Sequence, residues 1–159
     1  MSYPPPGGYQ GGGYAPPGPP PTGKTKTFGL DHNVAALLCY MAWCCCIGII
    51  ASIIWLVTEP KENKFLRFHA LQALFLVGVW IGAEIVLGIV GFAIGAGTGM
   101  MRGGGMAPAG GLGIILLWVA FHWFIRLIFF IIHVVAMIKA YGNQMWKLPV
   151  IGNLADSNS

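Results

Sequence analysis

The sequence contains very little charge. Only 9% of its 159 residues are Asp, Glu, Lys or Arg, whereas 56% are hydrophobic. Soluble globular domains carry about 25% charged residues, so the deficit argues for a lipid environment. The net charge of +4 comes from nine basic residues scattered along the chain. They form no nucleic-acid-binding stripe and fit better as charges that flank a membrane. We therefore expect the lipid bilayer as a partner and no nucleic acid.

Cysteine is scarce and badly placed for cross-links. The four cysteines, Cys39 and Cys44–Cys46, fall in one apolar run. Three adjacent cysteines point to different sides of a helix, so they cannot build a disulfide framework or a tetrahedral metal site. We interpret them as small apolar side chains. Lipidation of Cys44–Cys46 is an alternative that their position within the run, rather than beside it, disfavours.

The usual signs of catalysis are also missing. Ser52 is the one serine in the apolar runs, and neither paired acids nor metal-spaced ligands occur. The glycine-rich segment Gly97–Gly111 lacks the lysine and the strand–loop–helix context of a phosphate-binding loop. We expect no enzymatic activity, no metal and no cofactor. One alternative is a b-type haem held by His69 and His133, which we expect on different helices toward the same membrane face.

The first 29 residues are rich in Pro, Gly and Tyr. The first 22 lack the apolar core of a signal peptide, and the segment has too little apolar surface to fold. We predict a disordered tail with polyproline II character around Pro16–Pro21. Its alternative use is as a docking strip for an aromatic-lined groove. Residues 157–159 are predicted to form a short polar tail.

Long apolar runs dominate the remaining chain. About 20 apolar residues suffice to cross a bilayer as a helix. We therefore predict an all-α membrane domain, residues 30–156, built as a bundle of three transmembrane helices. The spans are expected at about 34–58, 70–96 and 112–138. The more polar stretch Lys61–Gln72 is predicted to form an interfacial helical turn that leads directly into the second span.

Lys and Arg counts suggest an orientation for three spans. Five of these residues flank one side of the membrane and three flank the other. Because basic residues concentrate in cytoplasmic loops, this count predicts an external amino terminus and a cytosolic carboxyl terminus in a multi-pass protein of the cell membrane. The five are Lys61, Lys64, Arg67, Lys139 and Lys147, and the three are Lys24, Lys26 and Arg102.

Two opposite charges lie deep in the predicted spans. Glu84 is near the middle of the second span, and Arg126 is near the middle of the third. Consecutive spans run antiparallel, so the two residues have matching depths. Because ionisable residues at the membrane midplane usually face the bundle interior and pair, we predict an intramembrane ion pair. His122 and His133 share a helix face with Arg126 to within about 40° and extend it as a polar stripe.

Glycines mark the faces where helices could approach closely. Gly88, Gly91 and Gly95 lie within about 60° of Glu84 at 100° per residue, so the face that carries the acid also suits helix packing. Gly78 and Gly82 form a second small-residue pair on roughly the opposite side. That second face is predicted to serve another neighbour or a second copy of the chain.

Two motifs together resemble a known family. KFLRFHALQALFL at Lys64–Leu76 and KLPVIGNLA at Lys147–Ala155 are similar to a widespread family of small integral membrane proteins, long catalogued as a domain of unknown function. That family is related to the inner-envelope component of chloroplast protein import. The resemblance implies an all-helical membrane protein with three or four spans and no established catalytic residues. Its signature here comprises Arg67, Phe68, His69, Gln72, Leu148, Pro149 and Gly152.

The sequence supports two functional hypotheses. The first is a non-enzymatic membrane protein that acts as a subunit, scaffold, or assembly or translocation partner of other membrane proteins or of itself. The second is a channel or transporter component whose polar path for protons or anions is lined by intramembrane side chains. Those side chains are Glu84, His122, Arg126 and His133.

Overall fold

The computed structural model describes residues 23–41, 46–98 and 109–159. Most of the predicted tail lies outside the described residues, as do Cys44, Cys45 and Arg102. Within the described part the protein is all-helical. The helices are α1 (His32–Cys39), α3 (Ile47–Thr58), α4 (Lys64–Gly97), α5 (Ala109–Tyr141) and α6 (Ile151–Ser157).

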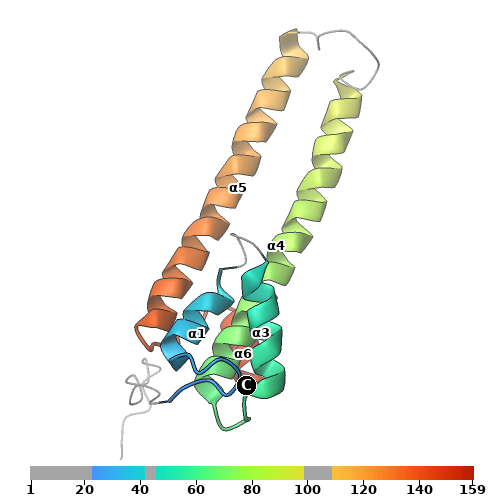
Figure 1. Cartoon of the computed structure of the whole chain (residues 1–159). Coiled ribbons are helices and arrows are strands. Elements are labelled where there is room, and N and C mark those ends of the chain that lie inside the picture. Colours follow the sequence, from blue (N-terminus) through green and yellow to red (C-terminus); the bar gives the residue numbers. More distant parts are fainter. Residues whose placement is uncertain (1–22, 42–45, 99–108) are drawn as a thin grey trace, which may run out of the picture.

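Two long helices determine the shape of the molecule (Figure 1). Helices α4 and α5 contain 34 and 33 residues, and at about 1.5 Å per residue each is about 50 Å long. Both are long and apolar enough to cross a membrane. They run antiparallel, and the three short helices gather around one end of the pair (Figure 1). The predicted interfacial turn is the beginning of α4, continuous with the span.

Burial divides the molecule into two parts. All buried residues of α4 lie at or before Val77, and all buried residues described in α5 lie at or after His133. We call the end that holds the short helices the base. We call the remainder of the two long helices, Gly78–Gly97 and residues 111–132, the arm. No residue of the arm is buried within the chain, so its apolar side chains have lipid or another protein as their natural cover.

The expectation of one continuous helix over residues 34–58 is wrong. Helix α1 ends at Cys39, and α3 begins at Ile47 after Cys46, which has a φ of 54°. A left-handed backbone at a residue other than glycine interrupts a helix. The two pieces contain 8 and 12 residues, or about 12 and 18 Å, and neither can cross a bilayer. Three transmembrane helices are therefore not confirmed.

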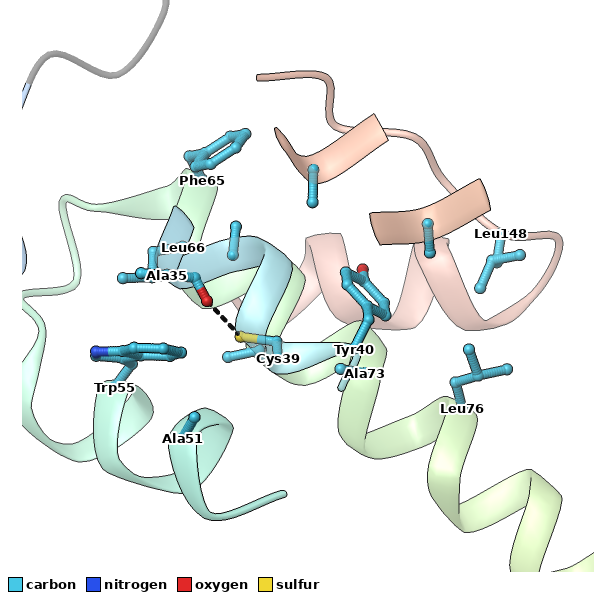
Figure 2. Close-up of a cluster of buried hydrophobic side chains, with 14 residues drawn as sticks. Ala35, Cys39, Tyr40, Ala51, Trp55, Phe65, Leu66, Ala73, Leu76 and Leu148 are labelled. Carbon is cyan, nitrogen blue, oxygen red and sulfur yellow. Dashed lines mark hydrogen bonds between the residues drawn. The ribbon is translucent and has the colours of Figure 1, made fainter. Parts of the chain in front are cut away.

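The base has a well-packed core lined by small side chains. Figure 2 shows Trp55 and Ala51 of α3 facing Cys39 of α1, whose Sγ donates to the carbonyl of Ala35 at 3.5 Å. Small residues let helices approach closely. Seven alanines from four helices join this core, namely Ala35, Ala36, Ala51, Ala70, Ala73, Ala136 and Ala140. The run predicted as the first span, residues 34–58, thus contains short helices of the base, with α1 packed against α3, α4 and α5.

The amino-terminal and carboxyl-terminal segments meet at the base. The backbone N–H of Lys26 donates to Oε1 of the buried Glu59 at 2.7 Å. The Asn33 amide donates to the Tyr141 carbonyl at 3.4 Å. Lys26, within the predicted tail, is therefore held against the end of α3 by the Glu59 carboxylate. The first described residues and the end of α5 thus lie at the same end of the molecule.

Candidate functional site

The arm contains a cluster of three ionisable side chains. Arg126 Nε donates to Glu84 Oε1 at 2.9 Å, and its Nη2 donates to Oε2 at 3.0 Å. These two parallel bonds form a bidentate pair, the strongest arrangement between a guanidinium and a carboxylate. His122, one turn before Arg126, places its Nε2 2.9 Å from Arg126 Nε and 3.2 Å from Glu84 Oε2. The ion pair predicted from matching depths is thus present.

Aromatic residues surround this cluster. The Trp123 ring lies 5.9 Å from the Arg126 guanidinium carbon, a cation–π distance. Trp80, one turn before Glu84, also interacts with its carboxylate. A cavity of about 260 Å³ lies beside the cluster and is lined by Trp118, Val119, His122, Trp123 and Arg126. The tryptophans were not predicted to lie beside the charges, although an indole N–H in an apolar run usually has a hydrogen-bond partner.

His133 does not join the cluster. It lies two turns after Arg126, buried at 3% exposure in the base, and its ring Nδ1 is 2.8 Å from the Phe129 carbonyl. Of the predicted polar stripe, His122 and Arg126 therefore lie beside Glu84, whereas His133 lies in the base. His133 is buried because this part of α5 lies in the base, where the helix packs against α1 and α4.

The glycines have different environments. A Cβ added to Gly91 would lie 2.7 Å from Trp118 Nε1, so this glycine admits the α5 tryptophan. Gly78, Gly82 and Gly88 have no atom within 4 Å of such a Cβ among the described residues. The Gly95 carbonyl accepts a bond from Thr98 at 3.2 Å. Of the predicted packing stripe, Gly91 alone is shown to give the close approach of α4 and α5.

The second group of polar residues lies in the base and joins the two signature motifs. The Gln72 side chain donates through Nε2 to Tyr40 Oη at 3.0 Å and to the Trp146 carbonyl at 3.1 Å. Its Oε1 accepts the backbone N–H of Leu148 at 3.3 Å. One fully buried amide thus joins α4 to the segment before α6 and to the end of α1. We call these interactions the Gln72 clasp.

Tyr40 and His69 complete the clasp. Tyr40 Oη lies 3.0 Å from His69 Nδ1. Because Gln72 Nε2 can only donate, the Tyr40 hydroxyl accepts that bond and is left to donate its own proton to His69. The His69 ring also packs edge-on against Phe65 and Phe68, at 4.7 and 5.1 Å between centroids. These contacts make His69 a packed core histidine.

The other signature residues hold the base in place. Arg67 Nη1 donates to the Leu56 carbonyl at 2.9 Å, which satisfies a carbonyl in the last turn of α3. Pro149 accepts the Ile151 N–H at 2.8 Å across Val150, a tight γ-turn. A Cβ on Gly152 would lie 2.6 Å from the Lys147 Cα, so only glycine fits there. Sequence reasoning missed Tyr40, whose hydroxyl in an apolar run was the available signal.

We predict that the Glu84–Arg126 pair is mutually dependent. Arg126→Ala or Glu84→Ala alone leaves an unpaired charge in the arm and lowers the free energy of unfolding by about 3 kcal/mol. The double variant, which leaves no charge, loses less than the sum of the two. Denaturant titration in mild detergent or lipid measures this double-mutant cycle. Additive losses would show that the two side chains are not coupled.

The clasp makes a separate stability prediction. Gln72→Leu has nearly the same volume but leaves the Trp146 carbonyl and the Leu148 N–H without their partner. Each unsatisfied buried group costs about 1–3 kcal/mol, so the melting temperature falls sharply. Gln144→Leu, at an exposed glutamine in the same base, is the matched control and changes stability by less than about 0.5 kcal/mol. Equal melting temperatures for the two variants would refute the clasp.

Comparison with known proteins identifies the family. The family described as "Magnetosome magnetite crystal formation protein family" matches residues 31–155. The UPF0132 membrane protein MJ1443 of Methanocaldococcus jannaschii is 32% identical over 142 residues, which cover 86% of this chain and 96% of the relative. A UPF0132 membrane protein of Archaeoglobus fulgidus is 29% identical over 128 residues, covering 80% and 94%.

A third relative, the UPF0132 membrane protein MJ1527 of Methanocaldococcus jannaschii, is 30% identical over 139 residues and covers 84% of this chain and 74% of the relative. No solved structure matches. These comparisons do not show the resemblance to chloroplast protein import. They agree with the two long apolar helices that this is a membrane protein. The chain belongs to the family of small membrane proteins described as magnetosome magnetite crystal formation proteins.

Proposed function

We propose that the chain is a non-enzymatic, multi-pass membrane protein that acts as a subunit or scaffold. In this proposal, another membrane protein or a second copy of the chain packs against the arm. The observation that carries it is the incomplete cover of the charged cluster. The side chains of Arg126, His122 and Glu84 are 37%, 24% and 20% exposed in a part of the chain with no buried residue.

Lipid is a poor cover for these groups. Polar side chains within a membrane normally face a protein interior or a water-filled cavity. Arg126 uses Nε and Nη2 in its bonds to Glu84, and no bond from Nη1 to the described residues is found. A partner helix that brings an acceptor or a polar backbone to the 260 Å³ cavity would satisfy Nη1 and shield the cluster.

The open glycines support the same proposal. Gly78 and Gly82 face outward from α4 with no neighbouring atom within contact distance of an added Cβ. Small residues on an exposed helix face allow another helix to approach closely in lipid. The base would then hold the pair of long helices together, while the arm presents surfaces for assembly.

The partner surface can be tested by photo-crosslinking in native membranes. A photoreactive amino acid at Val119, which lines the cavity, should give a discrete adduct. The same amino acid at Leu117, 73% exposed and about 160° away on α5, is the control and should give little. The Val119 adduct should disappear in an Arg126→Ala chain. Mass spectrometry distinguishes a second copy from another protein, including a preprotein-translocation component. Equal crosslinking from both positions would contradict the proposal.

We also propose that the chain crosses the membrane twice, with the base in the cytosol. Of the nine Lys and Arg residues, seven lie at the base, Arg126 lies in the arm, and Arg102 lies in sequence between the far ends of α4 and α5. Seven against one is a much stronger positive-inside bias than the count for three spans. The seven are Lys24, Lys26, Lys61, Lys64, Arg67, Lys139 and Lys147.

This topology predicts that both chain ends lie on the same side. In a chain whose four cysteines are replaced by alanine, a single cysteine at Ser159 or Ser2 should be protected from a membrane-impermeant maleimide in intact cells. A cysteine at Arg102 should react. Lysis should expose all three positions, which controls for reactivity. Labelling of Ser2 and Arg102 on the same side, with Ser159 on the opposite side, would instead indicate three crossings.

The second hypothesis, a channel or transporter component, depends on the same cluster. Glu84, His122 and Arg126 do meet beside a cavity, which favours some polar passage. His133 lies away from them in the packed base, and apolar side chains cover most of the arm. A subunit or scaffold therefore accounts for more of the described residues.

A further inference from the structure

Helix α3 has an apolar face that no other described part of the chain covers. Its residues Gly48, Ala51, Ser52 and Trp55 point into the base and are buried. On the opposite side, four apolar side chains are 46–80% exposed, namely Ile47, Ile50, Ile53 and Val57. The helix contains no charged residue. A face of this kind on a protein of aqueous solution would be an aggregation hazard, so its natural cover is lipid.

The depth of α3 can be estimated from its contacts. Arg67, which donates to the Leu56 carbonyl, fixes the end of α3 at the level of the basic residues that begin α4. Ile47 lies nine positions before Leu56, so at about 1.5 Å per residue the other end lies about 14 Å deeper. The hydrocarbon core of a bilayer is about 30 Å thick, and one leaflet contributes half of it. Helix α3 therefore has the length to reach the middle of the membrane and no further.

The two leaflets would then hold very different amounts of protein. In the leaflet on the base side, α1 and α3 pack against the long helices and occupy additional area. In the other leaflet the described residues contribute only the arm, where none of them is buried and two helices stand alone (Figure 1). A protein that widens one leaflet more than the other fits a membrane that is convex on the wider side.

We infer that α1 and α3 enter only the leaflet on the base side, and that the chain is thereby a one-leaflet wedge that concentrates in membranes curved convexly toward its base. The partner of the α3 face is the acyl chains of that leaflet. Insertion of an apolar helix face into one leaflet is sensitive to curvature. This inference rests on the proposed two-crossing topology and adds a function to it, namely sorting to, or stabilisation of, curved membrane.

The test uses the full chain in giant vesicles from which narrow membrane tubes are pulled. Two cysteine-replaced chains carry a single label site, at Ser159 in the base or at Arg102 between the long helices. An impermeant fluorescent maleimide then labels base-outward molecules in the first sample and base-inward molecules in the second. The ratio of protein to lipid fluorescence in the tube, relative to the vesicle, is measured as the tube radius falls.

The inference predicts opposite results for the two samples. Base-outward molecules should be enriched in the tube by about twofold or more, increasingly so as the radius falls, and base-inward molecules should be depleted. A ratio of one at all radii, or the same ratio for both samples, would overturn it. If cysteines at Ser2 and Ser159 label on opposite sides of the membrane, the two-crossing topology itself has failed. If they label on the same side and sorting is absent, only the wedge has failed.

A matched pair of variants ties the effect to α3. Replacing Ile50 and Ile53 by serine makes the exposed face polar without touching the buried side of the helix, and should bring the tube ratio toward one. Replacing Ile85 and Ile89 by serine changes two exposed arm residues on the lipid-facing surface and should leave the sorting in place. Loss of sorting in both variants, or in neither, would assign the effect to something other than the α3 face.

Discussion

The ion pair between Glu84 and Arg126 is the constraint on which the arm depends. Outside the base, α4 and α5 have few means of recognising each other, because their surfaces are almost uniformly apolar and lipid is as apolar as they are. In the same apolar environment, a guanidinium and a carboxylate are each other's most favourable partners. The bidentate geometry fixes the rotation of both helices, and the Trp118 indole fits against Gly91 on the same side.

The base is held together by interactions of a different kind from those of the arm. Three short helices must be held on a pair of long helices, and small side chains allow their backbones to approach. Position is then specified by buried hydrogen bonds, above all those of Gln72 to Tyr40, Trp146 and Leu148. The two signature motifs are far apart in the sequence, and the clasp explains why both are needed. They are two halves of one structural connection.

Much of the arm could be predicted from the sequence, because a bilayer imposes simple rules. Length and hydropathy located the second and third apolar helices, and equal depth paired Glu84 with Arg126. The first apolar run was misread for a physical reason. Hydropathy reports that residues 34–58 avoid water, but it does not distinguish a lipid-exposed helix from two short helices packed on a protein. The break at Cys46, which is neither glycine nor proline, carries no local signal.

Some features could not have been found without tertiary structure. Nothing in the sequence around Lys26 indicates that its N–H binds Glu59, and this contact attaches part of the predicted tail to the end of α3. The location of His133 similarly depends on the base surrounding the last turns of α5. Helical periodicity places His133 on the same face of α5 as Arg126. That face contacts Glu84 in the arm and is buried in the base two turns later.

The most direct measurement of the central claim is the distance between Glu84 and Arg126 in a lipid bilayer. Solid-state NMR can detect dipolar coupling between ¹³C in the Glu84 carboxylate and ¹⁵N in the Arg126 guanidinium, with a Glu84→Gln chain to identify the signal. N–O distances of 2.9 and 3.0 Å predict strong coupling that the substitution removes or shifts. An absence of coupling in a folded, bilayer-embedded chain would contradict the account.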